Sequence, residues 1–350
     1  MDYGIAVASS ADSWKLVKRA EELGFSHAWF YDTQMLCADV FVAMAAAAAH
    51  TSRIHLGTGV LIPSNRIAPV AANALASLNK LAPRRIVFGV GTGFTGRLTM
   101  GLGAMKLAEL AEYVRVVRAL LSGERVEWEC EGKRKKIQFL NPEAGLINIQ
   151  DPIPVHLSAM GPKARKLTAE IAEGWINFVF ALPLAVADAE AMLAEWRSAG
   201  KDAASCYATG FTLGCVLRDG EPYDSLRAKA QAGPLAAVML HALLERRMPG
   251  GLGPEIDLLL AKYRAVYETY EPADARYLTL HRGHLLFLRP EEQPLITAEL
   301  IRDFTFTGTR DALADRIRLL RDAGYRQLAI QLIPGHEDAL EDWVRVFERV

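Results

Sequence analysis

Three polar side chains in this sequence stand where they could take part in chemistry. Asp32 follows the apolar run AWFY, so its carboxylate would lie at the end of a predicted strand and could act in catalysis or contact a cofactor; capping of the next helix is the alternative. His281 and His284 lie three residues apart in HRGH. A metal site would need further ligands of fixed geometry, and no third one stands out, so we predict no metal and interpret both as loop histidines turned toward a substrate pocket. Asp32, His281 and His284 are therefore the catalytic candidates.

The remaining histidines that we consider divide into two groups. His336 stands in IPGH, just past the last predicted strand, and is a further candidate for the same rim as Asp32. We interpret the others as structural: His27, His50, His55 and His241. No GxSxG, HExxH or Walker sequence occurs, so nothing supports hydrolase or kinase chemistry.

A glycine-rich segment, Gly91–Gly96 (GTGFTG), formally matches GxGxxG after a predicted strand. A dinucleotide-binding turn would lead into a helix and then into a strand that ends in an acidic residue. Here the segment leads into RLTMGLG, and no suitable second strand follows. We therefore predict that the backbone at Thr92 and Gly93 lies against a planar ligand, with Thr92 and Arg97 adding polar groups; a plain strand–helix loop is the alternative.

A second turn, SAMGPK, is the better candidate for binding a phosphate. Pro162 suits the first position of a helix, so the free N–H groups that precede it would point at the mouth of that helix. An anion there gains both hydrogen bonds and the positive end of the helix dipole. A plain strand–helix turn explains the same residues equally well. The candidate residues are Ser158, Ala159, Met160, Gly161 and Pro162.

These residues must be positioned by strands, and eight short apolar runs separated mostly by helical patterns can supply them. Both ends of the chain carry a helix that stops at a glycine, at Gly24 and at Gly324, next to an apolar run. This repeat favours a closed α/β barrel, a (β/α)8 TIM barrel, over an open doubly wound sheet. The predicted strands are Gly4–Val7, Ala28–Tyr31, Ile54–Thr58, Ile86–Val90, Pro154–Ser158, Trp175–Phe178, Gly210–Val216 and Gln327–Leu332.

Two insertions interrupt the repeat of the single domain that we predict over residues 1–350. The alternating segment at about 124–148 predicts a β-hairpin around Glu131-Gly132. The segment at about 219–306 is predicted to be largely helical, with a break at Pro249-Gly250-Gly251, and precedes the last strand. Insertions of this kind commonly form lids or dimer surfaces.

The composition narrows the classes of partner. The 40 basic and 41 acidic side chains give no electrostatic reason to expect nucleic acid or a membrane surface as a partner. The start of the chain does not have the pattern of a signal peptide, and the four scattered cysteines indicate reduced thiols in a cytoplasmic protein. Apolar helices beside the barrel suggest a homodimer.

Several motifs in their order along the chain resemble one family. AWFYD, IHLGTGVLIP, LASLNKLAPRRIVFGVGTG, PVHLSAMGPKA and AEGWI are similar to the luciferase-like superfamily. That group comprises bacterial luciferase, flavin-dependent monooxygenases and deazaflavin (coenzyme F420) reductases of the methylenetetrahydromethanopterin reductase branch. The resemblance covers nearly the whole chain and is weakest at about 219–295.

The resemblance implies a place for the cofactor. It puts a non-proline cis peptide at Gly59-Val60, under the isoalloxazine ring, and it puts Thr92-Gly93 beside the ring and the ribityl chain. It implies that the turn Ser158–Gly161 receives the phosphate, and that Asp32 contacts the edge of the flavin. Gly59 and Val60 thereby join the cofactor-binding candidates.

The sequence also departs from the family in ways that bear on the substrate. Thr33 stands where the sugar-phosphate dehydrogenases of this family have a histidine, and Phe94 and Arg97 stand where they have Glu and Asn. Their substrate-phosphate lysine has no counterpart in NFVFALPL, and the first strand, GIAVA, lacks the Glu of the methanopterin reductases. Neither of these two activities is indicated.

The leading hypothesis is therefore an oxidoreductase that uses reduced FMN, supplied by a separate flavin reductase, and O2 to oxygenate a small organic substrate. The alternative is hydride transfer with coenzyme F420 and no O2. A second alternative is a flavin-binding protein without catalysis. In the two enzymatic hypotheses the cofactor carries the chemistry, and the protein supplies positioning, electrostatics and exclusion of water.

Overall fold

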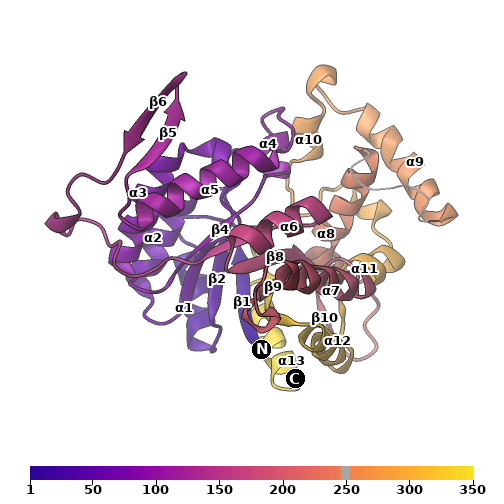
Figure 1. Cartoon of the computed structure of the whole chain (residues 1–350). Helices are drawn as coiled ribbons and strands as arrows, with labels where there is room; N and C mark the ends of the chain where they lie inside the picture. The colour runs from indigo at the N-terminus through magenta and orange to yellow at the C-terminus, as the bar shows by residue number, and fades with distance from the viewer. Residues whose placement is uncertain (246–252) are drawn as a thin grey trace.

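In the computed structural model, which describes residues 1–245 and 253–350, eight parallel strands close into a barrel (Figure 1). Their order is β1-β12-β9-β8-β7-β4-β3-β2, and the pairing of β1 with β12 completes the ring. This confirms the predicted TIM barrel and excludes the open sheet. The strands are β1 Asp2–Val7, β2 His27–Phe30, β3 His55–Thr58, β4 Ile86–Val90, β7 Val155–Ser158, β8 Gly174–Phe178, β9 Tyr207–Leu213 and β12 Tyr325–Gln331.

The strands are buried on both faces, as parallel strands covered by helices must be. Strand β4, IVFGV, is buried at all five positions. It lies so close to β3 that a Cβ on Gly89 would meet the carbonyl oxygen of Thr58 at 2.0 Å, so only glycine fits there. Thr58 Oγ1 donates a hydrogen bond to the same Gly89 carbonyl at 2.6 Å.

One predicted strand is displaced. The run expected at Gly210–Val216 forms β9 only as far as Leu213, because the chain then leaves the barrel. A Cβ on Gly214 would lie 2.0 Å from the Phe306 carbonyl oxygen, so this glycine permits a close crossing. Beyond it, β10 (Val216–Leu217) pairs with β11 (Gly308–Thr309) outside the ring.

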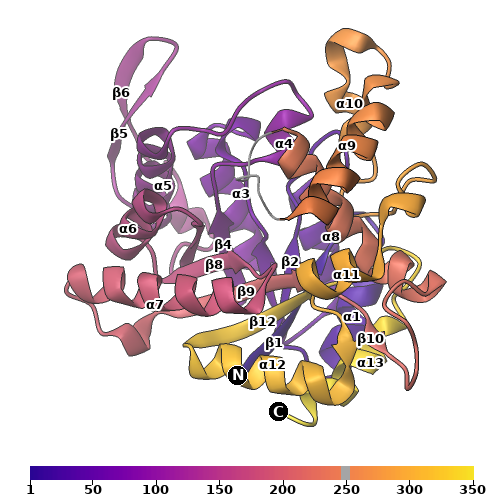
Figure 2. The same ribbon diagram turned by 90° about the vertical axis from the view of Figure 1, so that its right-hand side faces the viewer.

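Helices surround the barrel and pack on the outward side chains of its strands through a continuous apolar core. A short helix, α13 (Ala339–Phe347), ends the chain near the N-terminus (Figures 1 and 2). The surrounding helices are α1 Trp14–Glu22, α2 Val40–His50, α3 Ala68–Leu81, α5 Leu107–Leu121, α6 Pro162–Ile171, α7 Leu182–Ser198 and α12 Arg310–Asp322.

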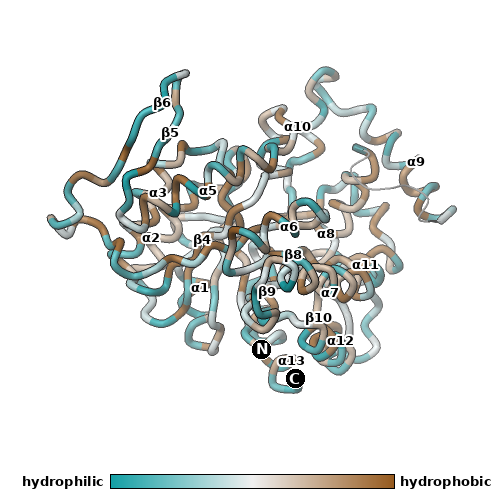
Figure 3. The backbone as a smooth tube through the Cα atoms, viewed as in Figure 1, coloured by the Kyte–Doolittle hydropathy of each residue, from teal (hydrophilic) through white to brown (hydrophobic). Residues whose placement is uncertain are grey.

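Both predicted insertions are present, on opposite sides of the molecule (Figure 2). Strands β5 (Val126–Cys130) and β6 (Lys133–Ile137) form the predicted hairpin around Glu131-Gly132, and its largely hydrophilic strand β6 projects from the barrel (Figure 3). The hairpin ends at Ile137, so the rest of the segment to 148 is not strand.

The helical insertion builds a second apolar core beside the barrel. The break predicted at Pro249-Gly250-Gly251 lies outside the described residues. None of the described helices combines the length and the apolar character needed to cross a bilayer. The helices of the insertion are α8 Leu226–Leu244, α9 Pro254–Glu268, α10 Tyr277–Leu280 and α11 Ala298–Phe304.

Candidate cofactor-binding and active site

A cavity of about 210 Å³ lies at the carboxyl ends of the barrel strands. The loops that follow β2, β3 and β4 border it together with Ser158 at the end of β7, and one turn of the helical insertion also lines it. A larger hollow of about 760 Å³ lies outside the barrel, between α5 and the hairpin, and no rim loop lines it. Since active sites of α/β barrels lie at the carboxyl ends of the strands, the smaller cavity is the candidate site.

The loop after β3 forms the floor of this cavity. The Gly59-Val60 peptide is cis, as the resemblance implies, and both residues line the cavity. A Cβ on Gly59 would lie 2.9 Å from Trp29 Cβ, so the loop rests directly on the side chains that fill the barrel. Beyond it, the Leu61 N–H donates to the Gly89 carbonyl, which ties the loop to β4.

Asp32 holds this loop in place. Its carboxylate, 4% exposed, accepts hydrogen bonds from the Ile62 N–H at 2.9 Å, from Asn65 Nδ2 at 3.1 Å and from Arg66 Nη1 at 2.8 Å. Burial alone would lower the pKa of Arg66, but its hydrogen bonds to Asp32 and Asp39 raise it. Asp32 borders the cavity as expected, but with three donors on its carboxylate we assign it to positioning and not to proton transfer.

The loop after β4 lies differently from the prediction. Gly93, Phe94 and Thr95 line the cavity, whereas Thr92 and Arg97 do not. The segment beyond Phe94 is not a plain loop: Thr95–Leu98 forms one helical turn, α4, and this turn carries the Arg97 side chain away to donate to the Gly103 carbonyl. Thr95, instead of Thr92 or Arg97, brings a polar side chain from this loop to the cavity.

The turn between β7 and α6 has the features expected of an anion site. Gly161 is the N-cap and Pro162 the first residue of α6, and no side chain caps the helix. No atom lies within 4 Å of the place that a Cβ on Gly161 would take. Arg165 donates to the Met160 carbonyl at 2.7 Å near the mouth of the helix, and its charge is paired there with Asp188 at 2.9 Å. Of the phosphate candidates Ser158 alone borders the cavity; Ala159, Met160, Gly161 and Pro162 lie beyond its lining.

The three histidines of HRGH and IPGH lie in three different places. His284 borders the cavity, and its Nε2 lies 3.1 Å from Thr95 Oγ1. His281 is fully buried behind it and does not line the cavity, so the expectation that it faces the substrate is wrong. His336 lies at a separate surface hollow.

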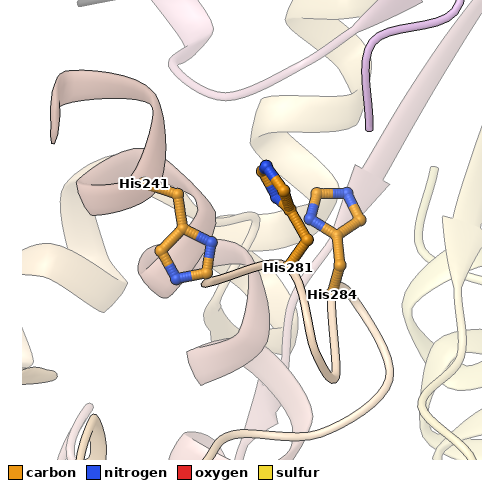
Figure 4. A group of neighbouring side chains, drawn as sticks. All are labelled: His241, His281 and His284. Atoms are coloured by element: carbon orange, nitrogen blue, oxygen red, sulfur yellow. The ribbon is translucent and has the colours of Figure 1, made fainter. Parts of the chain in front are cut away.

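The sequence interpretation missed a third histidine. His241, predicted to be structural, lies in α8 beside His281 and His284 (Figure 4). A third candidate ligand therefore lies beside His281 and His284, contrary to the expectation from the sequence. In the sequence, only the HRGH motif indicates a group of histidines. His241 is distant in the sequence and reaches this motif only because the helices of the insertion pack together.

Three further polar side chains of the cavity were also missed: Tyr31, Thr33 and Cys37. They lie on either side of Asp32 in the sequence, so their position just after β2 could have predicted that they line the site. Burial raises the pKa of Tyr31 and of Cys37, which keeps phenol and thiol protonated near neutral pH.

The residues present fit a coenzyme that has a flat ring and a phosphate-bearing tail. Gly59, Val60 and Gly93 line the cavity, and the chain runs from Ser158 at the border of the cavity to the N-terminus of α6, which no side chain caps.

Comparison with known proteins supports this interpretation. A family model described as luciferase-like monooxygenase matches residues 6–327. An F420-dependent glucose-6-phosphate dehydrogenase of Nakamurella multipartita is 37% identical over 140 residues, a match that covers 38% of this chain and 40% of that relative's length. The chain thus spans less than half of that relative in the match. A 5,10-methylenetetrahydromethanopterin reductase of Archaeoglobus fulgidus is 26% identical over 336 residues, covering 94% of this chain and 92% of the relative.

Solved structures share the fold. The coenzyme F420-dependent tetrahydromethanopterin reductase of Methanopyrus kandleri superposes with a TM-score of 0.72 at 20% identity, over 97% of this chain and 96% of that chain. A monooxygenase from Streptomyces bottropensis superposes with a TM-score of 0.63 at 18% identity, over 99% and 97%.

Proposed function

The chain belongs to the luciferase-like monooxygenase family of oxidoreductases, and from this premise we propose that it transfers a hydride between the deazaflavin coenzyme F420 and a small organic substrate. The observation that carries the coenzyme assignment is the set of curated relatives, which are named as F420-dependent or as methylenetetrahydromethanopterin reductases. This favours hydride transfer with coenzyme F420 over the leading FMN hypothesis.

Different residues of the site would hold different parts of the coenzyme. The N–H groups at the mouth of α6 would hold the phosphate of the coenzyme, with Arg165 nearby. The loop at Gly59-Val60 would support the ring, and Asp32 keeps that loop in position. When bound, the coenzyme supplies or accepts the hydride.

Thr95 is the polar group that we assign to the reacting oxygen of the substrate. Its hydroxyl borders the cavity, and His284 Nε2 at 3.1 Å can donate to Thr95 Oγ1. If His284 donates, the Thr95 hydroxyl keeps its own proton, which it can donate to an alcohol or carbonyl oxygen in the cavity.

The lining indicates an uncharged substrate. No Lys or Arg side chain borders the cavity within the described ranges 1–245 and 253–350, and the walls are formed largely by apolar side chains. A phosphorylated sugar would find no Lys or Arg side chain among the described residues of the cavity to bind its phosphate. This agrees with the differences from the sugar-phosphate dehydrogenases of the family at Thr33, at Phe94 and in NFVFALPL. We propose a small apolar alcohol or the corresponding carbonyl compound.

The test is anaerobic turnover. Oxidised F420 with a panel of small alcohols, and reduced F420 with the matching ketones and aldehydes, should each change the absorbance of the coenzyme when protein is added. Turnover that occurs only with reduced FMN and consumes O2 would contradict the proposal and restore the monooxygenase hypothesis, with its separate flavin reductase. Binding of a cofactor without any turnover over a broad panel would favour a non-catalytic flavin-binding protein.

We also propose that the protein is a cytoplasmic homodimer. Apolar side chains on α2 and α3 are exposed, among them Val42 (57%), Val70 (50%) and Leu81 (55%), and all four cysteines are free thiols. Light scattering should give twice the mass of the chain, and the mass of one chain would contradict the dimer.

A further inference from the structure

Three histidines of the helical insertion come together beside the cavity. His241 lies in the last turn of α8, His281 directly follows α10, and His284 lies three residues beyond. One ligand nitrogen from each lies within 4.8 Å of the other two. Figure 4 shows the rings converging, with a nitrogen of His241 and a nitrogen of His284 turned toward His281. In the described part of the chain no other group of three His, Cys, Asp or Glu side chains is gathered in this way.

Each of the three rings is held in its orientation by a polar contact at Nε2, on the side away from the other rings. His241 Nε2 lies 2.7 Å from Glu292 Oε1, and His281 Nε2 lies 3.0 Å from Glu245 Oε1. His284 Nε2 is engaged by Thr95 Oγ1. Histidines that bind metals characteristically donate their other ring N–H to a carboxylate or a comparable acceptor, because this fixes the tautomer and raises the basicity of the ligand.

The inner nitrogens of two of these rings have no hydrogen-bond partner. They are the Nδ1 atoms of His241 and His281, whose side chains are 3% and 0% exposed. A buried polar atom without a partner costs free energy, so the interior of the cluster favours a bound group. With Nε2 engaged, Nδ1 is the nitrogen that His241 and His281 each offer.

The frame around the cluster is rigid. Glu292 also accepts from Arg289 and from the Tyr263 hydroxyl at 2.9 Å, and Gln331 at the end of β12 donates to the Leu285 carbonyl at 2.6 Å.

We propose that His241, His281 and His284 bind one divalent transition-metal ion of the zinc class, with a fourth position open for water or a substrate oxygen. Imidazole nitrogens suit Zn2+, whereas Mg2+ and Ca2+ prefer oxygen ligands. On a tetrahedral Zn2+ the ligand nitrogens lie ~3.3 Å apart, since each Zn–N bond is about 2.0–2.1 Å. Small rotations of the side chains therefore close the present spacing of up to 4.8 Å.

The ion would lie in the wall of the proposed active site. His284 borders the cavity, while His281 and His241 lie deeper in the insertion. The assignment depends only on these side chains and not on which coenzyme the rim binds.

The experiment titrates the full chain, stripped with a chelator, with Zn2+ alone and without any coenzyme. Calorimetry should show one ion per chain, and Co2+ in its place should show the visible absorption of a tetrahedral ion. His284→Asn should weaken Zn2+ binding by more than the ~10–100-fold expected for Glu245→Gln, which removes only an outer partner. His50→Asn, on the exposed end of α2, is the matched control and should bind as the wild type does.

Two results would overturn the proposal. One is the absence of saturable binding in the wild type; the other is equal Zn2+ affinity in the wild type and in folded His284→Asn. If that variant does not fold, the Co2+ spectrum of the wild type decides, because an octahedral spectrum contradicts the site. Neither outcome depends on turnover, so the failure of this proposal is distinguishable from the failure of the F420 assignment.

Discussion

A group of three neighbouring histidines lies at each end of the barrel, and the two groups are built differently. At the bottom, His27 and His55 begin β2 and β3, and His156 lies near the start of β7. At the rim lie His241, His281 and His284. His27 and His55 stack with ring centroids 4.7 Å apart and planes 19° apart, whereas His281 meets His241 at 78° and His284 at 75°. Parallel stacking presents the faces of rings to each other, and perpendicular packing allows ring nitrogens to converge.

The partners of the rings differ as well. The bottom group lies among Trp29, Tyr207 and its own members, and no ion pair is found there among the described residues. Burial lowers the pKa of His156 to about 4, and burial together with the neighbouring His55 and His156 lowers that of His27 to about 3. At the rim, the Nε2 atoms of His241 and His281 each lie within hydrogen-bond distance of a carboxylate. The same residue type thus fills space at one end and is prepared for a ligand at the other.

The bottom group should make the protein sensitive to acid, which is the largest effect we expect. The folded pKa values of His27 and His156 lie below the ordinary value near 6.5, so the unfolded chain binds more protons between pH 6.5 and their folded pKa values. The free energy of unfolding is therefore highest above pH 6.5 and falls as the pH drops through this window. For the two rings together, the expected loss between pH 7.5 and 4.5 is about 5 kcal/mol.

Urea unfolding at several pH values measures this dependence. His27→Gln should remove about half of the slope, and His50→Gln, at an exposed position, should leave it unchanged. A wild-type stability that does not change between pH 6.5 and 4.5 would show that these rings are not buried in the neutral form.

Removing the carboxylate that holds the rim loop should cost less, about 3 kcal/mol. Asp32→Ala leaves Arg66, whose side chain is 14% exposed, without its buried partner and leaves the Ile62 N–H without an acceptor. Asp39→Asn removes the other partner of Arg66, which is 48% exposed, and should cost at most about 1 kcal/mol. Chemical denaturation of the two variants measures the difference; equal losses would contradict the assignment of Asp32 to positioning.

Crowding the bottom group should cost about 2 kcal/mol. A Cβ on Gly174 would lie 2.5 Å from the His156 ring, so Gly174→Ala forces that ring out of its place. Gly103→Ala meets no atom within 4 Å and is the matched control. Thermal melting should separate the two variants, while Zn2+ binding at the rim should survive in folded Gly174→Ala. A loss of Zn2+ binding in that variant would show that the two ends of the barrel are coupled.

The smallest effect is expected at Thr95. Thr95→Val keeps the shape but removes the hydroxyl that His284 orients, and it should lower kcat/KM by about tenfold, which corresponds to about 1.4 kcal/mol. Thr95→Ser keeps the hydroxyl and should retain most of the activity. Equal turnover in the valine and serine variants would remove Thr95 from the reaction.

The barrel could be predicted from the sequence because its strands are local patterns. Apolar runs such as IVFGV end at glycines, and these glycines mark places where chains cross closely, as Gly89 does against Thr58. The cis peptide at Gly59-Val60 came from the resemblance, and the structure confirms it.

The site was predicted less completely, for physical reasons. Arg97 was assigned to the ligand because of its position in a loop, but a single helical turn carries it away. The role of His241 depends on how α8 packs against a turn 40 residues later, which local periodicity does not encode. Asp32 was recognised, but its partner Arg66 lies beyond the next strand.

Equilibrium binding of the coenzyme tests whether the protein prefers F420 and whether the mouth of α6 holds its phosphate. Wild-type protein, Gly161→Ala and Gly161→Asp are titrated anaerobically with F420 and, separately, with FMN. We expect the wild type to bind F420 more tightly than FMN, Gly161→Ala to bind nearly as well, and Gly161→Asp to lose at least about 100-fold in affinity, because a carboxylate at the N-cap of α6 repels the phosphate. Tighter binding of FMN than of F420, or unchanged binding by Gly161→Asp, would contradict the account.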